Sequence, residues 1–299
     1  MRTERSRAAV LFGRVATLFA VVAGAIGGAA RFGWSGAIGF GAAAAVVVQL
    51  VERALARRLL RRRRLLAAPF PERWRSFLLE TYDHYERLPD ALRARFEDDL
   101  SIFLFETRIT GVGVEATEEL KLLVAASAVT LSVGWPDYEW SQVAEVLLYP
   151  QDFDRDYSFE GRELAGQAHP WGTLILSVPA LRQSFADPDD AFHVGIHEFA
   201  HLLDVDQNRF DGVPPGLEGA PEREWDGLVK KEMERLRRGK SVLDPYGAED
   251  PAEFLAVAVE AFFEAPLAMR QRHREMYALL SDYFRQDPAA WDDARGLTL

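Results

Sequence analysis

The sequence predicts an α+β domain that follows a pair of apolar helices, and three observations carry this prediction. Residues 1–64 contain two long uncharged stretches flanked by arginines. The rest of the chain combines segments of helical apolar periodicity with a few short runs typical of strands. Within one helical segment, residues 197–201 have the pattern His-Glu-x-x-His, which places two imidazoles on one helix face.

The N-terminal apolar stretches predict a transmembrane helical hairpin that meets the lipid bilayer through residues 15–51. Residues 32–51 form a run of twenty uncharged residues, about the number that a spanning helix needs. Residues 15–30 are fewer, and they reach spanning length only if Arg14 extends its side chain toward the membrane surface. Arg31 and a few small residues separate the two stretches, and their glycines suit close helix packing.

Arginines on both flanks predict the orientation of this hairpin. Arg2, Arg5 and Arg7 precede it, and residues 61–64 are all arginine. Because positive residues favour the cytoplasmic side, we expect a multi-pass protein of the inner membrane whose following domain lies in the cytoplasm. The alternative is an exported protein with a secretory signal, in which the small residues 27–30 precede a cleavage site.

Charge divides the chain into two parts. The total net charge is −11, and residues 1–64 carry twelve Arg and two Glu (+10), so the remainder carries −11 − 10 = −21. An acidic surface argues against nucleic-acid binding, because phosphate recognition requires clustered cations. The chain has no cysteine, so any metal site must use histidine and carboxylate ligands. The segment AAPFP predicts a linker, with a membrane segment at residues 1–66 and a second domain at residues 67–299.

The first half of the second domain predicts helices and short strands. Apolar residues at helical spacing predict three helices, at residues 72–86, 89–103 and 117–131. Three short strands are predicted at residues 107–112, 145–149 and 171–178. The strand at residues 171–178 is either an edge strand that pairs with an extended substrate or a strand of the core.

The second half of this domain is mostly helical. The acidic segment DPDD at residues 187–190 predicts the start of the helix that contains the His-Glu-x-x-His pattern. A loop rich in glycine and proline follows at residues 205–219. Helices are then predicted at residues 222–238, 250–264 and 268–284.

The His-Glu-x-x-His pattern predicts a metal site. His197 and His201 can aim both imidazoles at one ion, typically Zn²⁺. Glu198 lies at the edge of that face, where its carboxylate can reach a water on the metal and act as general base. Asp204 lies on the same helix face, and we expect its carboxylate to orient one of the histidine ligands by a hydrogen bond from outside the ligand shell.

The third metal ligand is left open by helix geometry. A catalytic zinc site usually takes three protein ligands, and the candidates for the third are Glu253, Glu260, Asp204 and His193. An Asp-Pro pair predicts a helix start at residue 250, which places Glu253 in the first turn and Glu260 two turns later on the same face. We expect His193 to be an ordinary helix histidine, one turn before His197.

Several motifs, in order, resemble a known family. They are EVLLYPQDF at residues 145–153, WGTLILSVPALRQSF at 171–185, IHEFAHLLD at 196–204 and DPYGAEDPAEFLAVAVEAFFEAP at 244–266. Over residues 71–288 the sequence resembles the Mlc titration factor A (MtfA) family of zinc metallopeptidases. The resemblance implies a zincin-like α+β metallopeptidase domain, with a core similar to the catalytic domain of anthrax lethal factor and one Zn²⁺ per chain. It implies Glu253 as the third ligand, Tyr246 as a group that stabilises the oxyanion, and Glu260 as a carboxylate outside the ligand shell.

The chain departs from this family in two features, the apolar hairpin with its arginine run and His193, where the family often has Asn. We expect a membrane-bound zinc peptidase that acts on a peptide or protein substrate, with Glu198 as general base. The alternative is a membrane-anchored regulatory binding protein with a non-catalytic zinc site. Glu198 argues against this alternative, since a structural site needs no general base. The sequence does not indicate a regulatory protein partner.

Overall fold

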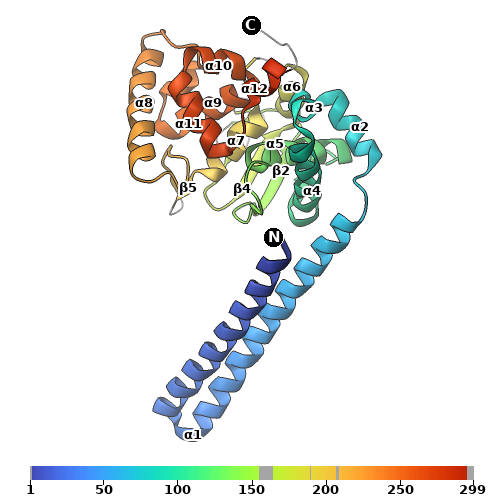
Figure 1. The fold of residues 1–299 in the computed structure, drawn as a ribbon, viewed down its shortest axis with the longest axis vertical. Coiled ribbons are helices and arrows are strands. Elements are labelled where there is room, and N and C mark those ends of the chain that lie inside the picture. Colours follow the sequence, from blue (N-terminus) through green and yellow to red (C-terminus); the bar gives the residue numbers. More distant parts are fainter. Residues whose placement is uncertain (1, 155–163, 189, 207–208, 295–299) are drawn as a thin grey trace. The chain divides into compact units, whose positions relative to one another are not determined.

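The computed structural model describes residues 2–154, 164–188, 190–206 and 209–294 (Figure 1). For most of residues 2–39 it describes the backbone and not the side chains. The chain divides into two compact units, residues 1–69 and residues 70–299, each with its own internal contacts.

The first unit is the long helical segment α1 (Arg2–Ala67), which is broken at Gly33. Gly33 has φ 68° and ψ −160°, a conformation that glycine adopts readily because it has no Cβ. The chain reverses there, and the two arms of α1 run antiparallel (Figure 1). The predicted helical hairpin is therefore present as a backbone arrangement, with Gly33 at its turn.

The transmembrane character predicted for residues 15–51 is not supported by the structure. Among the described residues, no helix has both the length and the hydropathy needed to cross a bilayer. Gly33 interrupts the second predicted span near its start. The structure describes few of the side chains of residues 15–30. The location at the inner membrane stays a prediction.

The second unit contains a four-stranded sheet with the order β1-β2-β4-β3. The strands β1 (Arg108–Gly111), β2 (Glu145–Tyr149) and β4 (Thr173–Ser177) run parallel, and β3 (Gly166–Ala168) pairs antiparallel with β4. The strand predicted at residues 171–178 is thus a central strand, and its interpretation as an edge strand is wrong. Strands β1 and β3 form the two edges of the described sheet, and the residues of β3, Gly, Gln and Ala, give no strand signal in the sequence.

Two helices of this unit approach each other unusually closely. They are α5 (Glu118–Ser132), which begins at the N-cap Thr117, and α7 (Val194–Leu203), which contains the His-Glu-x-x-His pattern. A Cβ at Gly195 of α7 would lie 2.7 Å from Ser127 Cβ of α5, closer than side chains tolerate. Gly195 therefore permits the close packing of the two helices, and it does not break the helix.

The remaining helices surround this pair and the sheet (Figure 1). They are α2 (Glu72–Thr81), α3 (Asp83–Arg87), α4 (Asp90–Glu106), α6 (Val178–Ala186), α8 (Ala220–Arg237), η1 (Pro245–Ala248), α9 (Pro251–Glu264), α10 (Pro266–Arg272), α11 (Arg274–Phe284) and α12 (Pro288–Ala294). A two-stranded hairpin, β5 (Val205–Asp206) and β6 (Arg209–Phe210), lies in the predicted loop after α7.

Two helices predicted as continuous are each split in two. The chain is extended at Tyr82 (φ −137°), between α2 and α3, and at His273 (φ −130°), between α10 and α11. Both side chains are buried, so packing in the core overrides the helical periodicity of the sequence at these two positions.

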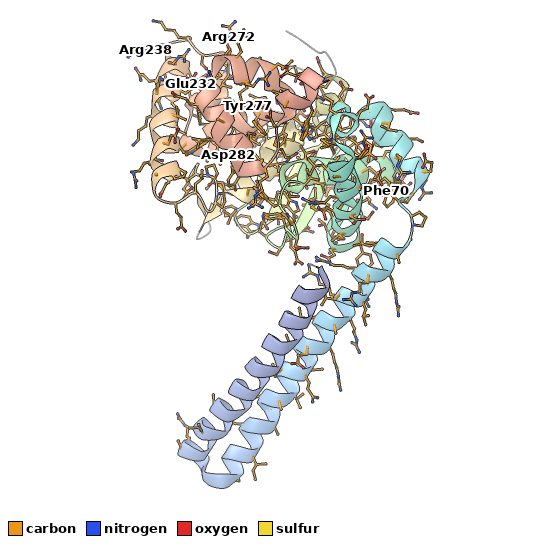
Figure 2. All side chains as sticks on the ribbon, viewed as in Figure 1. Phe70, Glu232, Arg238, Arg272, Tyr277 and Asp282 are labelled. Carbon is orange, nitrogen blue, oxygen red and sulfur yellow. The ribbon has the colours of Figure 1, made fainter. Side chains whose placement is uncertain are left out.

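Buried polar contacts join the C-terminal helices to the rest of the unit. Glu232 on α8 and Tyr277 on α11 are labelled in Figure 2. Glu232 accepts a hydrogen bond from Ser241 Oγ, and Tyr277 donates from its hydroxyl to Asp287 at 2.7 Å. Trp225 Nε1 on α8 donates to the carbonyl of Gly212 at 2.8 Å. This last bond fixes the loop that follows the metal-binding motif.

Candidate metal centre

The helix that carries the motif begins later than predicted. The segment at residues 187–190, of which residue 189 lies outside the described residues, is not helical, and α7 begins at Val194. His193 is the N-cap, with φ −145° and ψ 91°, and its Nδ1 accepts the N–H of Ile196 at 3.2 Å. Both the predicted acidic helix start and the interpretation of His193 as a helix-interior residue are therefore wrong. Asp190 instead accepts the N–H of Phe192 at 2.8 Å, before the helix begins.

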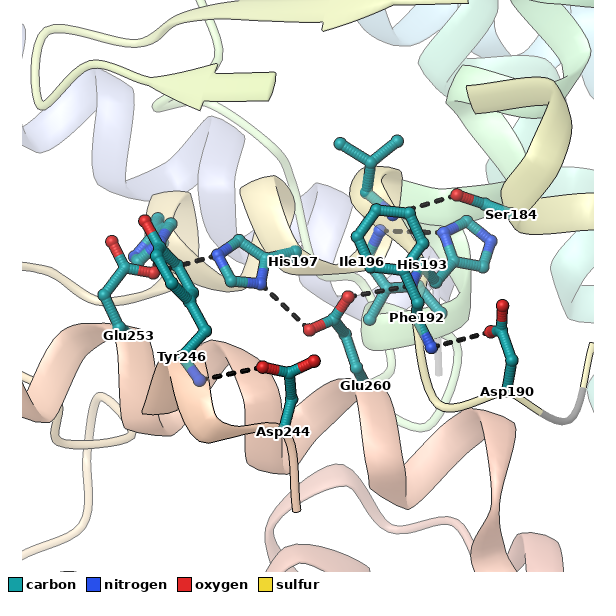
Figure 3. Close-up of polar contacts among 12 residues, drawn as sticks. Ser184, Asp190, Phe192, His193, Ile196, His197, Asp244, Tyr246, Glu253 and Glu260 are labelled. Atoms are coloured by element: carbon teal, nitrogen blue, oxygen red, sulfur yellow. Dashed lines mark hydrogen bonds and ion pairs between the residues drawn. The ribbon is translucent and has the colours of Figure 1, made fainter. Parts of the chain in front are cut away.

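Three side chains converge between α7 and α9. His197 Nε2 lies 3.0 Å from Glu253 Oε2, and His201 Nε2 lies 3.3 Å from the same oxygen. The three donor atoms all lie within 4.8 Å of one another (Figure 3). Glu253 is held in the first turn of α9, where Asp250 Oδ1 accepts the N–H groups of Ala252 and Glu253 at 2.8 and 3.0 Å. The structure thus brings together two histidines and one of the two candidate glutamates.

The spacing of these donors fits a tetrahedral metal ion. Two ligand atoms that are each about 2.0–2.1 Å from a tetrahedral ion are about 3.4 Å apart. The separations from Glu253 Oε2 to the two imidazole nitrogens are 3.0 and 3.3 Å, close to that value. Two imidazoles and one carboxylate are also the donor types that zinc and similar divalent ions accept. The residues present therefore fit such an ion.

Glu260 occupies the opposite side of the His197 ring. Glu260 Oε2 lies 2.9 Å from His197 Nδ1, so the two glutamates of α9 contact the two nitrogens of one imidazole (Figure 3). If Nδ1 donates a proton to Glu260, the lone pair of Nε2 points at Glu253 Oε2, and two acceptors face each other. Either a proton on Nε2 or a metal cation between the two atoms removes this conflict, and Glu260 favours the tautomer that leaves Nε2 free to bind a metal.

The charges in the cluster favour a cation at its centre. Burial opposes a charge on His197, but Glu260 and Glu253 outweigh burial and raise the pKa of the imidazole. Burial also opposes the charge on Glu253, yet hydrogen bonds from both histidines hold the pKa of its carboxyl well below its usual range. The cluster therefore stabilises positive charge between the imidazoles and Glu253, which is the charge that a divalent ion supplies.

Glu198 lies beside the cluster under the edge of the sheet. Its side chain is buried, with 6% of the residue exposed, and burial raises the pKa of its carboxyl. A Cβ at Gly166 of β3 would lie 2.7 Å from both Glu198 Cγ and Oε1. Strand β3 therefore passes directly over Glu198 because residue 166 is glycine. Gly166 is not predictable from the sequence, since a single glycine in a polar stretch carries no signal.

Tyr246 stands at the open side of the cluster. Its ring centroid lies 6.0 Å from that of His197, and 41% of the residue is exposed. It belongs to η1, where Asp244 Oδ1 accepts the N–H of Tyr246 at 2.8 Å (Figure 3). Burial and the charge of Glu253 both raise the pKa of the phenol, so the hydroxyl keeps its proton and can donate it in a hydrogen bond.

Asp204 does not contact a histidine. It is the C-cap of α7, with 1% of the residue exposed, and its Oδ2 accepts the N–H of Gly212 at 2.8 Å. Asp204 Oδ1 and His201 Nδ1 are both buried and have no hydrogen-bond partner among the described residues. The predicted bracing of a ligand by Asp204 is thus absent, because its carboxylate holds the loop after β6 instead. Burial, with Asp211 nearby, raises the pKa of Asp204 to about 8.

Comparison with known proteins decides the family. The sequence profile of the family described as "Glucose-regulated metallo-peptidase M90" matches residues 56–285, which include all the residues of the cluster. The chain belongs to the M90 metallopeptidase family. The resemblance to the Mlc titration factor A family, first recognised from sequence motifs, is confirmed by relatives of that name. The M90 match begins at residue 56, so residues 1–55 lie outside it.

Three relatives illustrate how far the M90 similarity extends. The Mlc titration factor A of Edwardsiella ictaluri is 31% identical over 74% of this chain and 88% of its own length. That of Escherichia coli O1:K1 is 29% identical over 56% of this chain and 68% of its own length. An uncharacterised protein of Synechocystis sp. is 27% identical over 76% of this chain and 89% of its own.

Proposed function

We propose that this M90 family member is a zinc-dependent peptidase that hydrolyses peptide bonds with Glu198 as general base. The observation that carries the proposal is the convergence of His197 Nε2, His201 Nε2 and Glu253 Oε2, with a buried carboxylate, Glu198, next in sequence to the first of them. Burying a carboxylate is costly unless it has a partner or a role, and a general base is such a role.

The residues of the cluster divide the chemistry between them. Zinc, when bound, supplies Lewis-acid activation of a water molecule and of the scissile carbonyl. Glu198 takes the proton of the attacking water and later delivers it to the leaving amine. The raised pKa of Glu198 suits this exchange, because it brings the carboxyl closer to the operating pH. Tyr246 donates a hydrogen bond from its hydroxyl to the developing oxyanion.

The outer edge of β3, which pairs with no other strand among the described residues, is the surface on which we place the substrate backbone. Backbone hydrogen bonds run from Ser177 N–H to Ala165 O and from His169 N–H to Thr173 O, so Ala165 and His169 point their backbone groups toward β4. Because successive residues of a strand point their backbone groups in opposite directions, Gly166 and Ala168 present theirs to the open edge. An extended peptide that pairs with these groups lies alongside Glu198, since Gly166 touches that side chain. Because residue 166 has no Cβ, the Glu198 side chain can lie against β3, and a peptide paired with the outer edge of β3 lies close to that carboxylate.

The alternative function is a regulatory binding protein that uses zinc for structure alone. Several relatives of this chain are named Mlc titration factor A, and that name favours the alternative in which the chain binds a regulator. The buried Glu198 favours catalysis, because a purely structural zinc site is closed by protein ligands and needs no base beside it.

Metal analysis combined with a peptide-library assay tests the proposal. The full chain, purified without chelator, is expected to contain about one zinc ion and to cleave library peptides. A chelator is expected to abolish cleavage, and added Zn²⁺ is expected to restore it. Zinc binding without cleavage of any library peptide would favour the regulatory alternative. The absence of any bound transition metal would exclude both functions.

A further inference from the structure

Side-chain acceptors hold four backbone N–H groups at the start of α7 and in the residue just before its N-cap. The bonds are Phe192 N–H to Asp190 Oδ1 (2.8 Å), His193 N–H to Glu260 Oε1 (2.7 Å), Val194 N–H to Ser184 Oγ (3.0 Å) and Ile196 N–H to His193 Nδ1 (3.2 Å) (Figure 3). These groups have no partner within a helix, so side chains must satisfy them. One of the four acceptors, Glu260, also belongs to the metal centre.

Glu260 joins the N-cap of α7 to a metal-binding imidazole. Its Oε1 accepts the backbone N–H of His193, and its Oε2 lies 2.9 Å from His197 Nδ1. The side chain is 3% exposed, so water does not compete for either oxygen. Both oxygens of the Glu260 carboxylate are therefore engaged. Because the carboxylate is rigid, the direction of the His193 N–H, which binds Oε1, sets the position of Oε2 beside His197.

The His193 imidazole fixes the direction of its own backbone N–H. The residue is fully buried, and its ring packs against the ring of Phe185 at 4.7 Å between centroids. Burial lowers the pKa of His193 to about 3, so the ring stays neutral and Nδ1 remains an acceptor for Ile196 N–H. The capping bond and the ring packing together hold the extended backbone of the N-cap.

We propose that His193 is a positioning residue of the metal centre, which raises zinc affinity by acting through Glu260 on His197. The inference rests on the zinc site of the proposed function, and it does not require peptidase activity. Groups that orient a metal ligand typically contribute about 10- to 100-fold in affinity or activity. His193 thereby couples the folding of the helix end to the orientation of a ligand one turn away.

A competitive zinc titration on the full chain tests this inference with three variants. His193→Ala removes the capping nitrogen, and we expect zinc affinity to fall about 10-fold or more. His193→Asn retains an acceptor, since Asn is among the best N-cap residues, and we expect affinity to return toward that of the unmodified chain. Ser184→Ala is the matched control, because it removes an acceptor of the same helix end and leaves the Glu260 contacts intact.

Two readouts separate positioning from a merely structural role. Ser184→Ala is expected to lower the melting temperature of the apoprotein yet leave zinc affinity unchanged. In a Glu260→Ala background, His193→Ala is expected to cause no further loss of affinity, because its route to His197 is gone. Equal affinity losses for His193→Ala and Ser184→Ala, or additive losses with Glu260→Ala, would overturn the inference.

The outcome for His193 is distinguishable from the outcome for the proposed function. A chain that binds zinc with the expected variant pattern but cleaves no peptide would refute the peptidase proposal and support the role of His193. A chain that cleaves peptides while His193→Ala retains full zinc affinity would do the reverse.

Discussion

Glu253 Oε2 and Glu260 Oε2 face opposite nitrogens of His197, at 3.0 Å from Nε2 and 2.9 Å from Nδ1. Helix periodicity places the two glutamates on one face of α9 and cannot rank them as ligands. The structure separates them, because Glu253 also lies 3.3 Å from His201 Nε2, whereas Glu260 turns its other oxygen to His193 N–H.

We expect Glu253→Ala to lower zinc affinity much more than Glu260→Ala. The first variant removes one of the three converging donors, while the second removes a partner of His197 that typically contributes about 10- to 100-fold. A competitive zinc titration on both variants measures the difference. If Glu260→Ala loses the metal and Glu253→Ala keeps it, the two glutamates must exchange roles.

Glu198→Gln is expected to bind zinc normally and to lose peptidase activity by about 10²–10⁴-fold. Glutamine preserves the shape of the side chain and cannot accept the proton from water. Metal content and turnover of a library-selected peptide are measured on the same preparation. Turnover equal to that of the unmodified chain would rule out Glu198 as the base.

Tyr246→Phe is expected to keep the metal and to slow the chemical step by about 10²–10³-fold. The substitution removes only a hydroxyl that stands at the open side of the cluster, so the fold and the ligands are retained. Single-turnover kinetics measure the step directly. An unchanged rate would mean that Tyr246 does not touch the reacting carbonyl.

Gly166→Ala is expected to displace Glu198 and to lower kcat by about 10²-fold, the usual effect of an ångström-scale misplacement. The new methyl group would lie 2.7 Å from Glu198 Cγ and 2.8 Å from Val194 Cγ2. Zinc affinity should change little, because the three atoms nearest the new methyl group belong to Glu198 and Val194 and not to a metal donor. Gly227→Ala on α8 is the control, since a Cβ there meets nothing within 4 Å. Equal activity of the two variants would show that β3 does not constrain the base.

Asp204→Asn is expected to remove a pH dependence of stability. Burial raises the pKa of Asp204 to about 8, above the value of 3.8 that the unfolded chain has. Between these values the folded state holds one proton more than the unfolded state, so the free energy of unfolding falls as pH rises. Urea unfolding at pH 5 and pH 8 measures this slope, which Asn lacks because it does not titrate. The same slope in both proteins would show that Asp204 ionises normally.

The parts of the site that the sequence predicts are those set by local patterns. Local patterns predict that His197 and His201 share one helix face and that a helix starts at Asp250. Each pattern involves only a few neighbouring residues, and α7 and α9 confirm both. The family resemblance, carried by contiguous motifs, is likewise confirmed. The α+β class follows from the same periodicities.

The parts that the sequence does not predict depend on contacts between distant segments. Strand β3 exists because Gly166–Ala168 pairs with β4, and none of its residues favours a strand alone. Asp204 binds Gly212 through the fold of an intervening loop, so a helix-face argument aims its carboxylate wrongly. His193 caps α7 because the surrounding side chains bury it in an extended conformation. This burial outweighs the tendency of the acidic segment before it to start a helix earlier.

The order of the donors along the chain sets a limit during synthesis. Glu253 follows His197 by 56 residues, and the whole of α8 lies between them. At about 5–20 residues per second, a ribosome needs roughly 3–11 s to add that segment. Until then the two histidines have no carboxylate partner from α9, and a site of three donors cannot form. The three-donor site can therefore form only after α9 has emerged from the ribosome and packed against α7.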